Sequence, residues 1–140
     1  MISVIIGTHG MFSEEILKSA EMIFGNQENI GTVTFKPGEG VDKLVEKYNK
    51  LINELDSTDG VLFMVDLFGG SPFNAASIIA MKNDNVEIVT GVNLPMILET
   101  LGSREFSNLS ELLAIAENSG KEAIRVLTKN LETDTDDELA

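Results

Sequence analysis

The sequence predicts an α/β protein with a doubly wound, mainly parallel sheet that carries helices on both faces. Short apolar stretches of β type alternate along the chain with longer amphipathic stretches of helical period, and this alternation is typical of repeated β-α units. One stretch, Val61–Val65, contains only apolar residues, as expected of a strand that is buried on both faces. We therefore expect parallel strands in the order 2-1-3-4, one of the common doubly wound arrangements.

The first half of the chain contains two expected strands and two expected helices. Ile2–Gly7 is an apolar run that ends in glycine, and it predicts the first strand. Residues 13–24 place their apolar side chains on one helical face, with Ser13 suited to the N-cap position. Ile30–Phe35 is the next expected strand, and Val41–Leu55 follows with a clear 3.6-residue apolar stripe.

The middle of the chain repeats this pattern. Val61–Val65 is the third expected strand, and Pro72 is suited to the first position of a helix that runs to about Met81, with Ser71 as its cap. Val86–Thr90 is a short fourth strand, followed by an expected helix at Leu94–Leu101.

The last expected elements are a helix and an edge strand. Leu109–Ser119 has helical period, Asn108 and Glu111 have the spacing of a capping box, and Gly120 is suited to end the helix. Lys121–Thr128 alternates apolar and polar residues, which predicts a C-terminal antiparallel edge strand.

The length of 140 residues fits one domain, which we expect to span residues 1–130. Residues 131–140 are expected to form an acidic, disordered tail, because Glu132–Ala140 contains five acids and no base. The alternative interpretation is the start of a linker to a downstream domain. The first residues have neither a basic segment nor a long apolar core, so no export or membrane element is expected and the predicted location is cytoplasmic.

The composition excludes several kinds of chemistry. The chain has no cysteine, which excludes disulfides, thiolate zinc sites and a cysteine nucleophile. Its single histidine, His9, cannot form a metal site of several histidines, and we expect neither a metal nor a cofactor. With 23 acids against 10 bases and a net charge of −13, nucleic acid is not an expected partner.

Chemically active residues converge on one edge of the predicted sheet. Ligands of doubly wound proteins bind at the carboxyl ends of the strands, near the point where strand order reverses. His9 and Asp66 end the two strands expected to be neighbours at that point, so the two side chains are expected to meet. A carboxylate that accepts a hydrogen bond from one ring nitrogen fixes the tautomer and makes the other nitrogen the nucleophile.

An expected anion site lies beside this pair. Gly69 and Gly70 permit a tight backbone nest at the start of a helix, where free N–H groups and the helix dipole favour phosphate. Ser71 and Thr8 each add a hydroxyl donor. A histidine nucleophile, an orienting aspartate and a phosphate site together predict phosphoryl transfer through a phosphohistidine. Each feature alone also has a plain structural interpretation, as a solvated histidine, a loop cap or a helix entrance.

Three sequence blocks carry a family resemblance. They are Ile5-Ile6-Gly7-Thr8-His9-Gly10, Val65-Asp66-Leu67-Phe68-Gly69-Gly70-Ser71-Pro72-Phe73-Asn74-Ala75-Ala76 and Gly91-Val92-Asn93-Leu94-Pro95-Met96. In this order and spacing they strongly resemble the IIA domain of the mannose-type sugar phosphotransferase system, over the chain to about Thr128.

The resemblance implies a phosphotransferase in which His9 accepts a phosphoryl group from the phosphocarrier protein HPr and passes it to the IIB component. It implies that Asp66 supports His9 and that Ser71 lies near the phosphate. It also implies a homodimer that exchanges its C-terminal strand, about Lys121–Thr128, and that meets the membrane only through the IIC and IID transporter. The sugar is not specified.

Two alternative functions could use some of the same residues. A phosphohistidine carrier or regulatory module serving another system, such as dihydroxyacetone kinase, would use the same relay chemistry. A histidine phosphatase or mutase is disfavoured, because Thr8 stands where such enzymes carry an arginine and the only arginines are Arg104 and Arg125.

Overall fold

The computed structural model describes residues 1–128 and contains, within them, one four-stranded parallel sheet. Its strands lie in the order β2-β1-β3-β4, which confirms the order predicted from the sequence. The strands are β1 (Ser3–His9), β2 (Ile30–Phe35), β3 (Val61–Val65) and β4 (Val86–Thr90). β1 and β3 are therefore neighbours in the middle of the sheet, whereas β2 and β4 form its two edges.

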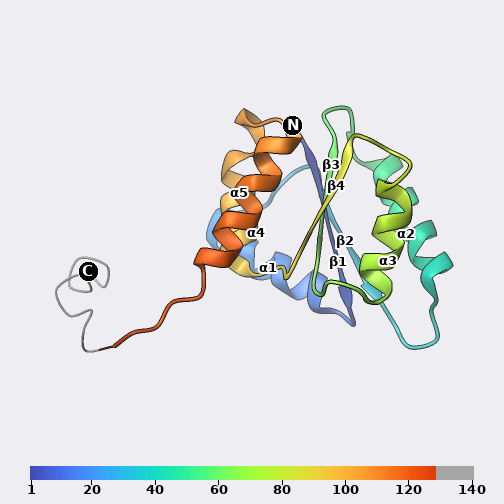
Figure 1. The fold of residues 1–140 in the computed structure, drawn as a ribbon, viewed down its shortest axis with the longest axis horizontal. Coiled ribbons are helices and arrows are strands. Elements are labelled where there is room, and N and C mark those ends of the chain that lie inside the picture. Colours follow the sequence, from blue (N-terminus) through green and yellow to red (C-terminus); the bar gives the residue numbers. More distant parts are fainter. Residues whose placement is uncertain (129–140) are drawn as a thin grey trace.

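Helices cover both faces of the sheet, as the doubly wound prediction requires. In Figure 1, α2 and α3 lie on one side and α1, α4 and α5 on the other. In the described part of the chain the helices are α1 (Phe12–Phe24), α2 (Val41–Glu54), α3 (Gly70–Ala80), α4 (Leu94–Ser103), a short 3₁₀ turn η1 (Arg104–Phe106) and α5 (Leu109–Glu122).

The core consists of two apolar layers separated by the sheet. Ile6 and Met64 pack in the layer beneath α1, α4 and α5, while Ile5 and Phe63 pack in the layer beneath α2 and α3. The five residues of β3 are all buried, which confirms that this continuous apolar run is covered on both faces.

Two helix starts differ from their predicted positions. Helix α1 begins at Phe12, and Ser13 is not its N-cap. The hydroxyl of Thr8 instead accepts a hydrogen bond from the Ser13 N–H at 2.7 Å, and the Ser13 hydroxyl donates to Val33 O at 2.9 Å. Helix α3 begins at Gly70, two residues before Pro72. Gly69 and Gly70 have φ values of 89° and 81°, which glycine adopts without steric cost.

The C-terminal part of the described chain also differs. Helix α5 has the predicted Asn108–Glu111 capping box, but it continues past Gly120 to Glu122, with Lys121 paired to Glu117 at 2.9 Å across one helical turn. In this single chain residues 124–128 form no strand, so the expected edge strand is not confirmed. The expected acidic tail, residues 131–140, lies outside the described residues.

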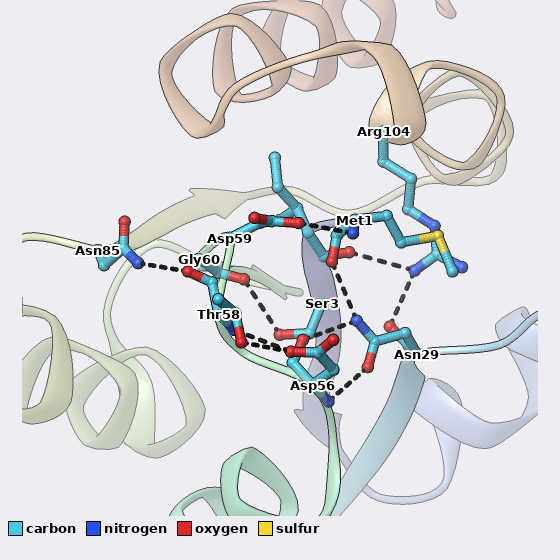
Figure 2. Close-up of polar contacts among 10 residues, drawn as sticks. Met1, Ser3, Asn29, Asp56, Thr58, Asp59, Gly60, Asn85 and Arg104 are labelled. Atoms are coloured by element: carbon cyan, nitrogen blue, oxygen red, sulfur yellow. Dashed lines mark hydrogen bonds and ion pairs between the residues drawn. The ribbon is translucent and has the colours of Figure 1, made fainter.

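A buried arginine ties together the amino ends of the strands. Arg104 is only 2% exposed, and its guanidinium donates to the backbone carbonyls of Ile2, Glu28 and Asn29. Figure 2 shows this group beside Asn29, whose side-chain amide donates to the carbonyls of Met1 and Asp56. Burial lowers the pKa of Arg104. The cluster joins the end of α4 to the starts of β1 and β2.

We expect Arg104→Met to destabilise the fold by about 3 kcal/mol, because three backbone carbonyls lose a charged donor while the side-chain length is kept. Urea unfolding followed by circular dichroism measures the change. The matched control is Lys18→Met, which removes an exposed ion pair with Glu15 and should change stability by less than about 0.5 kcal/mol. Equal shifts for the two variants would contradict this role of Arg104.

Candidate active site

The structure brings His9 and Asp66 into direct contact. His9 is the last residue of β1, and Asp66 directly follows β3. Because Gly7 pairs with Val65 in the register of these neighbouring strands, the two strand ends meet at the same edge. His9 Nδ1 lies 2.9 Å from Asp66 Oδ2, and the backbone N–H of His9 donates to the same oxygen at 3.0 Å. The predicted meeting of the two residues is confirmed.

This geometry distinguishes the two ring nitrogens. An ionised carboxylate only accepts hydrogen bonds, so Nδ1 carries the proton that faces Asp66. In the neutral ring Nε2 then holds the lone pair and is the nucleophilic nitrogen. The His9 side chain is 44% exposed and the Asp66 side chain only 16% exposed. A partner can therefore reach the ring while the carboxylate behind it stays shielded.

The first turn of α3 faces the free nitrogen. A Cβ added to Gly70 would lie 3.3 Å from His9 Cε1 and 3.6 Å from Nε2, so only glycine lets the backbone approach the ring this closely. The first N–H groups of a helix lack carbonyl partners within the helix and lie at the positive end of its dipole. Of this turn, Gly70 lies against the ring. We call the turn Gly69, Gly70 and Ser71 the phosphate cradle, after the role predicted for it from the sequence.

Of the two predicted hydroxyl donors, Ser71 lies in the first turn of α3 and Thr8 is buried. Ser71 belongs to the phosphate cradle, at the second position of α3. Thr8 is only 1% exposed, and its hydroxyl donates to His9 O at 3.2 Å and accepts from Ser13 N. The structure therefore brings Thr8 to the start of α1 and not to the exposed face of His9.

The loop that follows β4, residues 91–93, is mainly structural. Asn93 accepts the Met96 N–H at the start of α4 and donates from Nδ2 to Gly120 O in α5. It lies with Gly91 and Phe68 along a groove of about 560 Å³ that also includes β4 residues such as Ile88. This loop therefore joins α4 to α5 next to the His9 site.

One site residue was missed by the sequence analysis. The ring of Phe35, at the end of β2, meets the His9 ring edge-on with centroids 5.6 Å apart. The signal was present in the expected strand order, because β2 neighbours β1 and Phe35 pairs with His9 in the register. An aromatic residue ending that strand could have been assigned to one side of the imidazole.

Exposed apolar residues follow both His9 and Asp66 in the chain. Met11 and Phe12 follow β1, and both are 47% exposed. Leu67 and Phe68 follow Asp66 and are 58% and 83% exposed. We call these four residues the apolar rim. Apolar side chains this exposed beside a reactive group are typical of a protein-docking surface.

The described residues contain no group of three or more histidine, cysteine, aspartate or glutamate side chains arranged to hold a metal ion. Within the same residues, no helix has the length and apolar character needed to cross a membrane.

Fold and site together define a class of protein: doubly wound α/β domains that present one carboxylate-oriented histidine, against a helix N-terminus, at the carboxyl edge of the sheet. Residues 3–117 match the family model EIIA-man, described as "PTS system fructose IIA component", where PTS is the phosphotransferase system. The chain therefore belongs to this family of IIA components, which are phosphoryl carriers in sugar uptake.

Individual relatives agree with this assignment. The chain is 49% identical over 127 residues to the mannose-specific EIIAB component of Escherichia coli, covering 90% of this chain but only 39% of that protein's length. It is 39% identical over 132 residues to the fructose-specific EIIA component of Bacillus subtilis, covering 94% and 90% of the two chains. A mannose/sorbose-specific IIA subunit from Enterococcus faecalis has the same fold, with a TM-score of 0.83, 28% identity and coverage of 91% and 95%.

Proposed function

We propose that His9 Nε2 accepts a phosphoryl group from phospho-HPr and passes it to a IIB component of the same sugar-uptake system. The observation that carries this proposal is the 2.9 Å contact between Nδ1 and Asp66 Oδ2, which leaves Nε2 as the reactive nitrogen. In the acceptance step the bond from phosphorus to the donor nitrogen breaks as a bond to Nε2 forms. The proton on Nδ1 stays on the side of Asp66 throughout.

The residues around the ring have distinct proposed roles. The Asp66 carboxylate stabilises the positive charge that the ring gains when Nε2 bonds to phosphorus. Backbone amides of Gly69 and Gly70, with the hydroxyl of Ser71, donate to the phosphoryl oxygens. Support comes from the position of Gly70, whose added Cβ would lie 3.6 Å from Nε2.

The apolar rim is the proposed docking surface for both protein partners. Its residues follow His9 and Asp66 closely in the chain, and its four side chains are between 47% and 83% exposed. The net charge of −13 favours partners with basic residues around their own phosphorylated group. These partners act in the cytoplasm, which is the proposed location of this chain, and the membrane is reached only through the IIC and IID components.

The sugar-transport role is favoured over service to a dihydroxyacetone kinase. The matching family model and the relatives from E. coli and B. subtilis are named as components for mannose or fructose. The transported sugar itself is a property of the membrane components with which this chain operates.

Phosphorylation in a reconstituted relay tests this function. The purified chain is incubated with phosphoenolpyruvate, enzyme I and HPr, and its intact mass is measured. We expect the gain of one acid-labile phosphoryl group, and heteronuclear NMR of the histidine ring should show the phosphorus on Nε2. No mass gain with a relay that phosphorylates HPr would overturn the proposal, and phosphorus on Nδ1 would overturn the role given to Asp66.

A homodimer with exchanged C-terminal strands is also proposed. Within residues 1–128, β4 has a neighbouring strand on one side only, and the groove of about 560 Å³ runs beside it. Val126 and Leu127 are 66% and 72% exposed in the single chain. Pairing residues 124–128 of one chain with β4 of another would cover these side chains. It would also give hydrogen-bond partners to the backbone N–H and C=O groups at the free edge of the sheet.

We expect the double variant Val126→Asp/Leu127→Asp to be monomeric and the unaltered chain to be dimeric, because charge on both faces of the added strand opposes its burial. Sedimentation velocity measures the mass in solution. The matched control, Met22→Asp, places an acid at a residue of α1 that is 90% exposed and should stay dimeric. A monomeric unaltered chain, or a dimeric double variant, would contradict the exchange.

A further inference from the structure

Tyr48 is a polar residue buried in the core beneath the His9 site. It lies in α2 and is 0% exposed. Its ring meets the Phe63 ring of β3 edge-on, with centroids 4.8 Å apart. The stripe of apolar residues in α2 would be completed equally well by phenylalanine, so the presence of a hydroxyl at this depth requires an explanation.

The hydroxyl contacts both elements that build the site. It donates to the carbonyl of Pro72, in the first turn of α3, at 3.0 Å. On its other side it lies against β1, because a Cβ added to Gly7 would be only 2.1 Å from the Tyr48 oxygen. Glycine at position 7 is thus what allows the hydroxyl to occupy this place.

The two contacts lie very near the reacting groups. Gly7 precedes His9 by two residues in β1, and Pro72 directly follows the phosphate cradle. Gly70 of the cradle lies so near the ring that a Cβ added to it would be 3.3 Å from His9 Cε1. A small movement of the first turn of α3 relative to β1 therefore changes the distance from the cradle to Nε2.

The hydroxyl is held in its donor form. Burial is the main cause that raises the pKa of Tyr48, and the negative charge of Asp66 raises it further. Both causes favour the protonated hydroxyl, which is the form that donates to Pro72.

We propose that Tyr48 is a positioning residue for phosphoryl transfer: by holding the Pro72 carbonyl over Gly7, its hydroxyl sets the distance between the phosphate cradle and His9 Nε2. This inference rests on the proposed function. It predicts that Tyr48 affects the transfer step itself and leaves partner docking unchanged, because the apolar rim is exposed whereas Tyr48 is fully buried.

The test is Tyr48→Phe, which keeps the ring and removes the hydroxyl. With excess phospho-HPr in rapid-quench experiments, we expect the maximal rate of His9 phosphorylation to fall about tenfold, since displacements of an ångström or less weaken transition-state contacts. The HPr concentration at half-maximal rate should be unchanged. NMR provides a second readout: the shift of the Gly70 and Ser71 amide signals on phosphorylation should be smaller in the variant.

A second variant approaches the same contact from the other side. Gly7→Ala pushes against the Tyr48 oxygen and should also lower the maximal rate, and the double variant should be no slower than the slower single one because both act on one contact. The control is Leu112→Ala, which removes a fully buried side chain from the opposite layer. It should lower stability and leave the maximal rate unchanged.

The outcomes separate this inference from the proposed function. Failure of the unaltered chain to become phosphorylated would refute the function. If that chain is phosphorylated, an unchanged maximal rate and unchanged amide shifts in Tyr48→Phe would refute the positioning role. Equal slowing in Leu112→Ala would also refute it, because the effect would then follow stability alone.

Discussion

Replacing His9 by glutamine is expected to abolish phosphoryl acceptance completely. His9 is the single histidine among 140 residues, and the chain has no cysteine, so no second imidazole and no thiol is available to take over. Glutamine has a similar length and can still donate toward Asp66, but its amide nitrogen has no lone pair available for attack. The variant therefore removes the chemistry while largely keeping the shape of the site.

The measurement is the intact mass of the His9→Gln chain after incubation with phosphoenolpyruvate, enzyme I and HPr. No gain of acid-labile phosphate is expected, while far-ultraviolet circular dichroism and the unfolding midpoint should match those of the unaltered chain. Lys18→Gln, at a position of α1 whose side chain is 67% exposed, serves as the control and should be phosphorylated at the normal rate. Acid-labile phosphate on His9→Gln would show that another group is the acceptor.

Replacing Asp66 by alanine is expected to slow phosphoryl transfer by about 100-fold, in the range seen when the partner that orients a reactive histidine is lost. The reason is that Asp66 Oδ2 accepts hydrogen bonds from both the backbone N–H and Nδ1 of His9. Alanine removes both bonds together with the negative charge, so the ring loses its fixed direction and its preferred tautomer.

Asp66→Asn separates charge from geometry. The backbone N–H of His9 requires an acceptor at the Oδ2 position, so the amide oxygen is expected to remain there and to hold the same tautomer. Only the charge is lost, so the expected slowing is smaller than for alanine, which loses the charge and both hydrogen bonds. Rapid-quench rates of transfer from phospho-HPr and back to HPr measure both variants. Unchanged rates in both directions would remove Asp66 from the mechanism.

The sequence predicted the central sheet and the meeting of His9 and Asp66 for a common physical reason. A continuous apolar run such as Val61–Val65 clearly predicts a strand that is buried on both faces. The carboxyl ends of neighbouring parallel strands lie at the same edge of the sheet. The topology therefore placed two residues together that are far apart in the chain. The order β2-β1-β3-β4 and the 2.9 Å contact agree with this prediction.

Features that depend on packing at a distance could not be predicted. Ser13 is a residue type that often caps helices, but at the start of α1 the hydroxyl that accepts a backbone N–H is that of Thr8. In the sequence Arg104 stands out only as one of two arginines. Its buried contacts could not be predicted because they join segments separated by 75 or more residues. Tyr48 belongs to an ordinary helical stripe, and nothing local marks its contact with Gly7.

The C-terminal segment illustrates a different limit. Alternation over Lys121–Thr128 predicts a strand only if a second strand is present to pair with it, whereas Lys121 has the spacing to pair with Glu117 within a helix. In a single chain the local pairing prevails and α5 extends to Glu122. A strand over these residues would require the exchange between two chains that we propose.

The double contact of His9 with one carboxylate oxygen has a consequence for reversibility. The ring and its own backbone N–H are both bonded to Asp66 Oδ2, so rotation of the imidazole is already restricted before a partner arrives. Freezing such a side chain at each encounter would cost about 1 kcal/mol of entropy. Here that cost is met once, when the protein folds. In the proposed relay, the same ring direction would then serve both the arrival and the departure of the phosphoryl group.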